Sequence, residues 1–286
     1  MSMLPKPTHL APEYAQQFGD PSVVAAYHHR PPYPPQVIDH LLSLLVAPGT
    51  VLDAGTGTGE IARSLAQRGV RVDALDPSTA MLERGRHSPS GDHPLLSWIH
   101  GAAEDAPLGP RYGLITTAAS LHWMAWEIVL PRFRELLAPG GVLAIIEQRQ
   151  APRPWDSALS QVVTRSSTNR FYQPYDLIAE LERRTLFHPL GRVQTDSVAF
   201  TQPVADYVES FHARNGFSRD RMSPETAAAF DADAECLVRP FSQDGMITLE
   251  ITGHIVWGQP GSDGIIPVTE KTWRASPQVP PDEEGG

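Results

Sequence analysis

Three glycines that alternate with threonines stand between a short apolar run and a helical pattern, at Gly55, Gly57 and Gly59. Because glycine has no side chain, such a turn lets the backbone approach a ligand closely, and the helix that follows presents free N–H groups. Asp53 stands just before the glycines, and Asp76 ends the next predicted strand. An acid at that place reaches a ribose diol in doubly wound folds. The combination predicts a site for an adenosine-containing cofactor.

The spacing of the glycines separates the candidate cofactors. A dinucleotide fingerprint reads G-x-G-x-x-G, whereas this turn reads G-x-G-x-G. The Asp53 carboxylate would repel a pyrophosphate, and it suits a cofactor that carries an ammonium group and a sulfonium. No Gly-Lys-Ser/Thr follows the turn, which excludes a P-loop. A plainer interpretation, a tight strand-to-helix turn without a ligand, stays open on the spacing alone.

Strands and helices alternate around this turn over the first half of the chain. We predict strands at 50–54, 70–75, 96–101, 114–118 and 142–147, and helices at 34–48, up to Gly69, at 78–86 and at 126–137. Strands that alternate with helices form parallel βαβ units, and continuous apolar runs are typical of strands buried on both faces. The predicted fold is therefore α/β, with a doubly wound, mostly parallel sheet.

The pattern changes after about residue 150, where helical segments replace the regular alternation. We predict helices at 157–185, with a break at Gln173-Pro174, at 204–214 and at 224–238, and strands at 197–200 and 246–256. Gly253 interrupts the last of these strands and predicts a bulge there.

The charge and cysteine content of the chain exclude some classes of binding partner and of metal site. Lys and Arg total 23 against 33 Asp and Glu, so the net charge is -10 and a global nucleic-acid footprint is absent. A single cysteine, Cys236, excludes an intrachain disulfide and a Cys-rich metal cluster. The apolar runs are too short for a bilayer of about 30 Å, and the first residues lack a signal core. We expect a cytoplasmic monomer or homodimer with no metal and no membrane or nucleic-acid partner.

Motifs in the first half of the chain resemble those of the class I S-adenosylmethionine-dependent methyltransferases. Leu75-Asp76-Pro77-Ser78 followed by Met81 is similar to the ribose segment of that family, and residues 101–108 are similar to its adenine segment. Residues 136–143 match the turn into its fifth strand. Ser120-Leu121-His122-Trp123 and the lead at 26–34 resemble a small-molecule subgroup with a His-Trp pair after strand four.

The resemblance implies a Rossmann-like methyltransferase fold with a helical, substrate-covering insertion after strand five. It divides the chain into an N-terminal lid segment at 1–33, a cofactor-binding core at 34–150, substrate-covering helices with C-terminal strands that complete the sheet at 151–258, and a mobile tail at 259–286. The implied cofactor is S-adenosylmethionine, and the implied partner is a small-molecule methyl acceptor.

The resemblance also assigns the cofactor-binding residues. Asp53 faces the ammonium group, directly or through water, Asp76 accepts the ribose hydroxyls, and Tyr27 and Arg30 form a lid. Ala102 stands where the adenine segment often carries Asp, so the adenine amino group is left to Glu104 or to the backbone near Ala103. The remaining residues line the methionine, the adenine or the closing wall of the site: Gly55, Thr56, Gly57, Gly59, Pro77, Met81, Ala118 and Ala119.

His122 is the candidate base, since the ordinary pKa of histidine lies near the working pH. The alternative is a pocket-wall residue. For the acceptor site the resemblance implies Trp123, Trp155, Phe171, Tyr172 and Tyr175, although aromatics in helices are also typical of a core.

The function predicted from these residues is in-line transfer of a methyl group to an O, N or C atom of a small molecule. Two alternatives stay open. One is a non-catalytic cofactor-binding or regulatory protein that retains the pocket, and the other is an NAD-dependent oxidoreductase, which the glycine spacing disfavours.

Overall fold

A twisted sheet forms the centre of the computed structural model, which describes residues 6–109 and 111–261. Its strand order is β3-β2-β1-β4-β5-β8-β6, with β7 paired to β8, and the first five strands of that order are parallel. The strands are β1 (Thr50–Ala54), β2 (Arg71–Asp76), β3 (Leu96–His100), β4 (Tyr112–Ala118), β5 (Leu137–Gln150), β6 (Phe187–Gln194), β7 (Val198–Pro203) and β8 (Met246–Pro260). The order reverses between β1 and β4, which is where ligands bind in open α/β sheets.

Helices cover both faces of the parallel part of the sheet. The first half of the chain supplies α1 (Pro12–Ala15), α2 (Pro21–Ala26), α3 (Pro35–Leu44), α4 (Glu60–Gln67), α5 (Thr79–Arg86) and α6 (Trp126–Leu136). Leu41 of α3 and Leu65 of α4 pack in one hydrophobic cluster with β1 and β2. Phe133 of α6 packs in another, with residues of β4 and β5. The predicted α/β fold with a doubly wound, mostly parallel sheet is confirmed.

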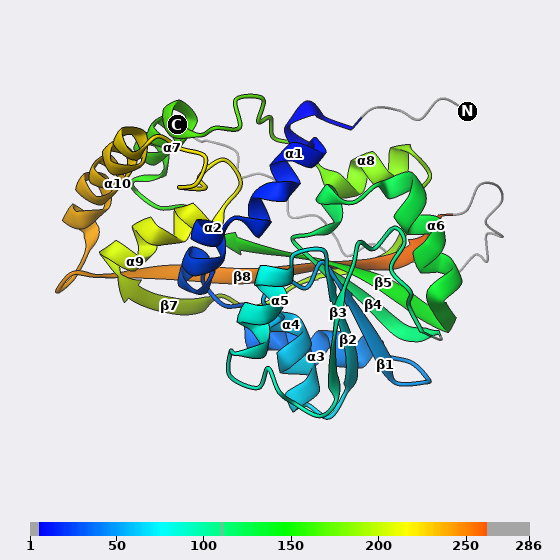
Figure 1. Ribbon diagram of the computed structural model, residues 1–286. Helices are drawn as coiled ribbons and strands as arrows, with labels where there is room; N and C mark the ends of the chain where they lie inside the picture. The colour runs from blue at the N-terminus through cyan, green and yellow to red at the C-terminus, as the bar shows by residue number, and fades with distance from the viewer. Residues whose placement is uncertain (1–5, 110, 262–286) are drawn as a thin grey trace, which may run out of the picture.

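A third hydrophobic cluster lies at the far end of β8. This long strand pairs with β5 and β6 through its second half and with β7 through its first half. Figure 1 shows it crossing the molecule toward α7 (Asp156–Ser166), α9 (Val204–Glu209) and α10 (Pro224–Val238), which contribute to this cluster. The remaining helix after β5, α8 (Leu177–Arg183), lies beside α6 and packs in the cluster that contains Phe133.

The second half of the chain departs from the sequence expectations in three places. The break predicted at Gln173-Pro174 is present but longer than predicted, since residues 167–176 form an irregular segment between α7 and α8. Strand β6 was not predicted, because its alternating exposed and buried pattern includes a proline and a glycine. The bulge predicted at Gly253 is wrong: this glycine pairs with Gln148 in unbroken register. A Cβ there would lie 2.3 Å from Val37 Cγ2, so close packing of α3 explains the glycine.

The N-terminal segment packs against the turn Ser210–Ala213 through α2. Asp20 also links the N-terminal segment to the residues that follow this turn, since it accepts hydrogen bonds from Ser218 Oγ (2.6 Å) and from the Arg221 guanidinium. The division of the chain into four segments stays a prediction, and most of the predicted tail lies outside the described residues. Over 6–109 and 111–261, the helices lack the length and apolar character needed to cross a membrane.

Gly59 and Gly69 flank α4 and offer a matched test of the packing between the glycine turn and β3. Both have a positive φ, +75° and +82°, but a Cβ on Gly59 would lie 2.4 Å from the Trp98 ring, whereas one on Gly69 would meet nothing within 4 Å. Backbone strain alone costs about 1 kcal/mol for Gly69→Ala, and the added collision brings Gly59→Ala to about 3 kcal/mol. Urea unfolding of both variants measures the difference, and equal losses would show that the Trp98 contact is unimportant.

Candidate functional site

The glycine turn lies at the carboxyl ends of β1 and β2 and is held by backbone hydrogen bonds. The N–H groups of Gly55 and Thr56 both donate to the carbonyl oxygen of Leu75, at 2.8 and 2.9 Å. All three glycines of the turn have positive φ angles, a conformation that strains other L-residues. A Cβ on Gly55 would lie 2.4 Å from Ser120 Cβ, so the turn also packs against the segment after β4.

A pocket of about 390 Å³ opens over this turn, and we call it the cofactor pocket. Its size is within the ordinary range for small-molecule sites. Its walls come from the glycine turn, the ends of β2 and β4, the segment after β3 and the N-terminal segment. The predicted residues that line it are Tyr27, Arg30, Gly55, Gly57, Asp76, Pro77, Met81, Ala103, Glu104, Ala118, Ala119 and Trp123.

The Asp76 carboxyl group lies in the wall of the cofactor pocket. Its Oδ2 accepts a hydrogen bond from Gly57 N–H and its Oδ1 accepts one from Ser78 N–H, both at 2.8 Å. Burial raises the pKa of this carboxyl to about 6, although the two backbone donors oppose the shift. Each oxygen keeps a free lone pair, so an ionised Asp76 can accept both hydroxyls of a ribose.

Asp53 lies behind the turn, outside the cofactor pocket. Its carboxylate accepts hydrogen bonds from Thr56 Oγ1 (2.5 Å) and Thr116 Oγ1 (2.7 Å), and burial raises its pKa. Asp53 and Thr56 line a small cavity of about 30 Å³, roughly the volume of one water molecule, which shares Arg30 and Gly55 with the cofactor pocket. The two predicted routes to the ammonium group, direct or through water, both stay open.

Gly59 lines neither cavity. It caps α4 at its first turn, and its missing side chain makes room for Trp98. The structure gives Gly59 a packing role, and its place among the cofactor-binding residues stays a prediction. Ala103 and Glu104 both line the cofactor pocket, and one Glu104 oxygen already accepts the Ala125 N–H at 2.7 Å.

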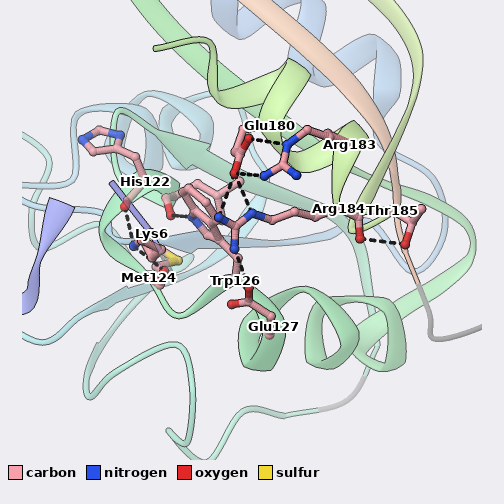
Figure 2. Close-up of polar contacts among 10 residues, drawn as sticks. Lys6, His122, Met124, Trp126, Glu127, Glu180, Arg183, Arg184 and Thr185 are labelled. Carbon is pink, nitrogen blue, oxygen red and sulfur yellow. Dashed lines mark hydrogen bonds and ion pairs between the residues drawn. The ribbon is translucent and has the colours of Figure 1, made fainter. Parts of the chain in front are cut away.

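The segment after β4 is fixed by a lysine that the sequence analysis missed. Figure 2 shows Lys6 donating from Nζ to the carbonyl oxygens of His122 (2.7 Å) and Met124 (2.9 Å). The Lys6 ammonium also lies 4.6 Å from the centroid of the Trp126 ring. The Arg184 guanidinium carbon lies 5.1 Å from the centroid of the same Trp126 ring. Since the partners of Lys6 are backbone carbonyls, no side-chain motif in the sequence could have pointed to it.

A second cavity, of about 860 Å³, lies beside the cofactor pocket, and we call it the acceptor cavity. The two share Phe18, Arg30, Ala119 and Trp123 as a common wall. Among the predicted residues His122, Trp123, Tyr172 and Tyr175 line the acceptor cavity; His9, Asn169 and Arg214 also line it and were not predicted.

Two predicted acceptor-site aromatics lie elsewhere. Trp155 is buried in the cluster of α7, α9 and α10, where its Nε1 donates to the Tyr207 hydroxyl. Phe171 is 60% exposed and lines a separate groove beside Asp176. Trp155 stands just before the first residue of α7, whereas Phe171 lies in the irregular segment between α7 and α8, so the two aromatics have different surroundings.

His122 is enclosed in a site that disfavours its charged form. Burial lowers the pKa of this imidazole to about 3, and the positive charges of Lys6 and Arg30 add to the shift. The side chain is therefore neutral at ordinary pH and a weak base. Within 6–109 and 111–261, no group of three or more His, Cys, Asp or Glu side chains could hold a metal ion.

Comparison with known proteins gives the family. A family model described as a methyltransferase domain matches residues 51–141. An uncharacterized methyltransferase of Mycobacterium tuberculosis is 33% identical over 183 residues, which are 63% of this chain and 69% of that protein. The chain belongs to the class I methyltransferases, and its cofactor is S-adenosylmethionine.

Matches to other members are shorter or more distant. Trans-aconitate 2-methyltransferase of Delftia acidovorans is 41% identical over 102 residues, which are 33% of this chain and 36% of that protein. The tRNA 5-carboxymethoxyuridine methyltransferase of Escherichia coli is 37% identical over 101 residues, or 34% and 39%. A solved structure from Anaeromyxobacter dehalogenans that carries a methyltransferase name has a TM-score of 0.57 at 23% identity, covering 80% of this chain and 97% of that one. It supports the fold alone.

Asp76→Asn in this methyltransferase tests the ribose assignment. The amide loses the charge that strengthens hydrogen bonds to the hydroxyls, so we expect the affinity for S-adenosylhomocysteine to fall by about tenfold or more. Titration calorimetry measures this, with the exposed Asp39→Asn as the matched control. In the wild type the affinity should also fall as the pH drops below about 6, because the raised pKa lets Asp76 take up a proton there. An unchanged affinity, or the same pH dependence in the variant, would refute the assignment.

Proposed function

We propose that this methyltransferase transfers the methyl group of S-adenosylmethionine to an O, N or C atom of a small molecule bound in the acceptor cavity. The observation that carries the proposal is the common wall, at Arg30, Ala119 and Trp123, between the cofactor pocket and the acceptor cavity. A methyl donor in the cofactor pocket and an acceptor in the acceptor cavity would both contact these shared residues, so the two reactants would lie next to each other.

The cofactor supplies a methyl group already activated by a positive sulfur. The protein's own task is then to bind, align and exclude water, and alignment alone can supply roughly 7–11 kcal/mol of a barrier. Asp76 and the glycine turn would fix the nucleoside and methionine ends. Lys6 would hold the segment Ala119–Met124 in place at the common wall.

A small acceptor fits the surroundings of the cavity better than a nucleic acid. The N-terminal segment contributes His9 and Phe18 to its lining, and the segments after β5 contribute Asn169 and Arg214, so both would cover a bound acceptor as the predicted lid and insertion. The net charge of -10 opposes a polyanionic partner. One relative is named for trans-aconitate, a small acid, but another is named for a tRNA nucleoside, which makes tRNA the class to test against.

Transfer of a labelled methyl group tests this function directly. The chain is incubated with S-adenosylmethionine labelled in its methyl group and with separate pools of small acids, phenols, amines and total tRNA. We expect label in a small-molecule product and none in tRNA. Label in tRNA alone would refute the small-molecule acceptor, and cofactor binding without any transfer would favour the non-catalytic alternative.

His122→Asn tests whether the imidazole acts as a base. A general base contributes about 100-fold or more to the rate, whereas a neutral wall residue contributes less. Because the His122 pKa is lowered to about 3, we propose the wall role and expect kcat/KM to fall by less than about tenfold. The pH profile should show no step near 6.5 that His122→Asn removes. A loss of 100-fold with unchanged cofactor affinity would restore the base.

A further inference from the structure

The Arg214 guanidinium lines the acceptor cavity, and no described residue gives it a hydrogen bond or an ion pair. From this side chain we infer that the acceptor is an acid with more than one carboxylate, that Arg214 binds one of them, and that a second one is methylated. The inference rests on the proposed function, because it names the substrate class of the same cavity.

Arg214 is held in place without a counterion. It follows the turn Ser210–Ala213, its N–H donates to the Phe211 carbonyl, and its guanidinium lies 4.0 Å from the centroid of the Phe211 ring. Burial lowers its pKa to about 10, so the group still carries its charge at neutral pH. Packing on the ring fixes the plane of the guanidinium while its N–H groups stay unused.

Several other arginines in the second half of the chain have carboxylate partners. Arg153 pairs with Asp156, Arg219 with Glu209 and Asp231, and Arg221 with Asp20. A charge removed from bulk water without a partner is costly, and a bound anion would offset that cost. The planar guanidinium matches a carboxylate with two parallel hydrogen bonds.

The rest of the acceptor cavity has the same electrostatic character. Its lining includes three arginines, Arg30, Arg170 and Arg214, against one carboxylate, Glu147, which is already paired with Arg149 at 3.0 Å. The cavity is therefore positive in a protein whose net charge is -10.

Two residues that line the acceptor cavity also have side-chain polar atoms without a hydrogen-bond partner among the described residues. These atoms are the buried Nε2 of His9 and Oδ1 of Asn169. Asn169 itself is anchored, since its Nδ2 donates to the His9 carbonyl and to Asn215 Oδ1. Both atoms are covered by neighbouring groups, so they add polar character to the wall of the cavity.

Carboxylate methylation also removes the need for a base. A carboxylate is ionised at neutral pH, so its oxygen can attack without losing a proton. The oxygen forms a bond to the methyl carbon as the carbon–sulfur bond breaks, the electron pair goes to the sulfur, and the products are a methyl ester and S-adenosylhomocysteine. Since hydrogen bonds to Arg214 would weaken a carboxylate as a nucleophile, the reacting carboxylate is a different one, nearer the common wall.

The test uses short aliphatic dicarboxylic and tricarboxylic acids, with their amides as neutral probes and glycerol phosphate as the phosphate probe. Labelled methyl from S-adenosylmethionine is followed into product, and alkali then releases methanol from esters only. We expect alkali-labile product from one or more acids and none from amides or phosphate. Arg214→Gln should raise KM for the acid by about thirtyfold or more, with kcat within about threefold and S-adenosylhomocysteine affinity unchanged.

Two variants serve as controls. Arg214→Lys keeps the charge and should restore part of the affinity for the acid. Arg165→Gln removes an exposed arginine of α7 that is paired with Asp233 outside the cavity, and it should leave KM unchanged.

An unchanged KM in Arg214→Gln, an alkali-stable product, or transfer to amides or phosphate in place of acids would overturn the inference while leaving the small-molecule function standing. If no small molecule is methylated although S-adenosylhomocysteine binds, the proposed function fails and the inference fails with it.

Discussion

The hydrogen bond from the Gly57 N–H to the Asp76 carboxylate is the contact on which the cofactor pocket depends. It joins the glycine turn to the end of β2, and the two N–H bonds to the Leu75 carbonyl bring the same elements together. Gly55 and Gly57 have positive φ angles in this turn, a conformation that glycine adopts without strain. The resulting burial raises the pKa of Asp76 and leaves its free lone pairs toward the pocket.

The common wall between the two cavities depends on a second set of contacts, made by residues distant in sequence. Lys6 binds two carbonyl oxygens of the segment after β4, and the Ser120 hydroxyl donates to the Ala54 carbonyl at 2.7 Å. Because Lys6 uses backbone acceptors, it fixes the path of this segment without regard to its side chains. The His122 ring is thereby left free to face the acceptor cavity.

Charge is distributed unequally between the two cavities. Asp76 and Glu104 line the cofactor pocket, with Asp53 behind its turn, whereas arginines dominate the acceptor cavity. A sulfonium donor suits the acidic side, and an anionic acceptor suits the basic side. Arg30 lines both cavities and the small cavity at Asp53, which places one charge where the two halves of the reaction would meet.

Local sequence patterns are enough to predict the parallel core and most of the cofactor pocket. Its signals are local: a glycine turn behind a strand, an acid at the end of the next strand, and apolar runs with the period of strands and helices. These arrangements need only neighbouring residues and the standard βαβ connection, so most of the predicted residues from Gly55 to Ala119 line one pocket.

The surroundings of the acceptor cavity depend on contacts between segments that are distant in the sequence. No local pattern connects the segments that contain Lys6, His9, Asn169 and Arg214. These segments meet because β8 joins the sheet to the cluster of α7, α9 and α10, and because Asp20 binds the N-terminal segment to residues of that region. Trp155 and Phe171 show the converse, since aromatic type does not say whether a residue packs in a core, faces solvent or lines a cavity. Burial and the absence of a counterion are properties of three-dimensional packing, which is why the unpaired Arg214 could not be found in the sequence.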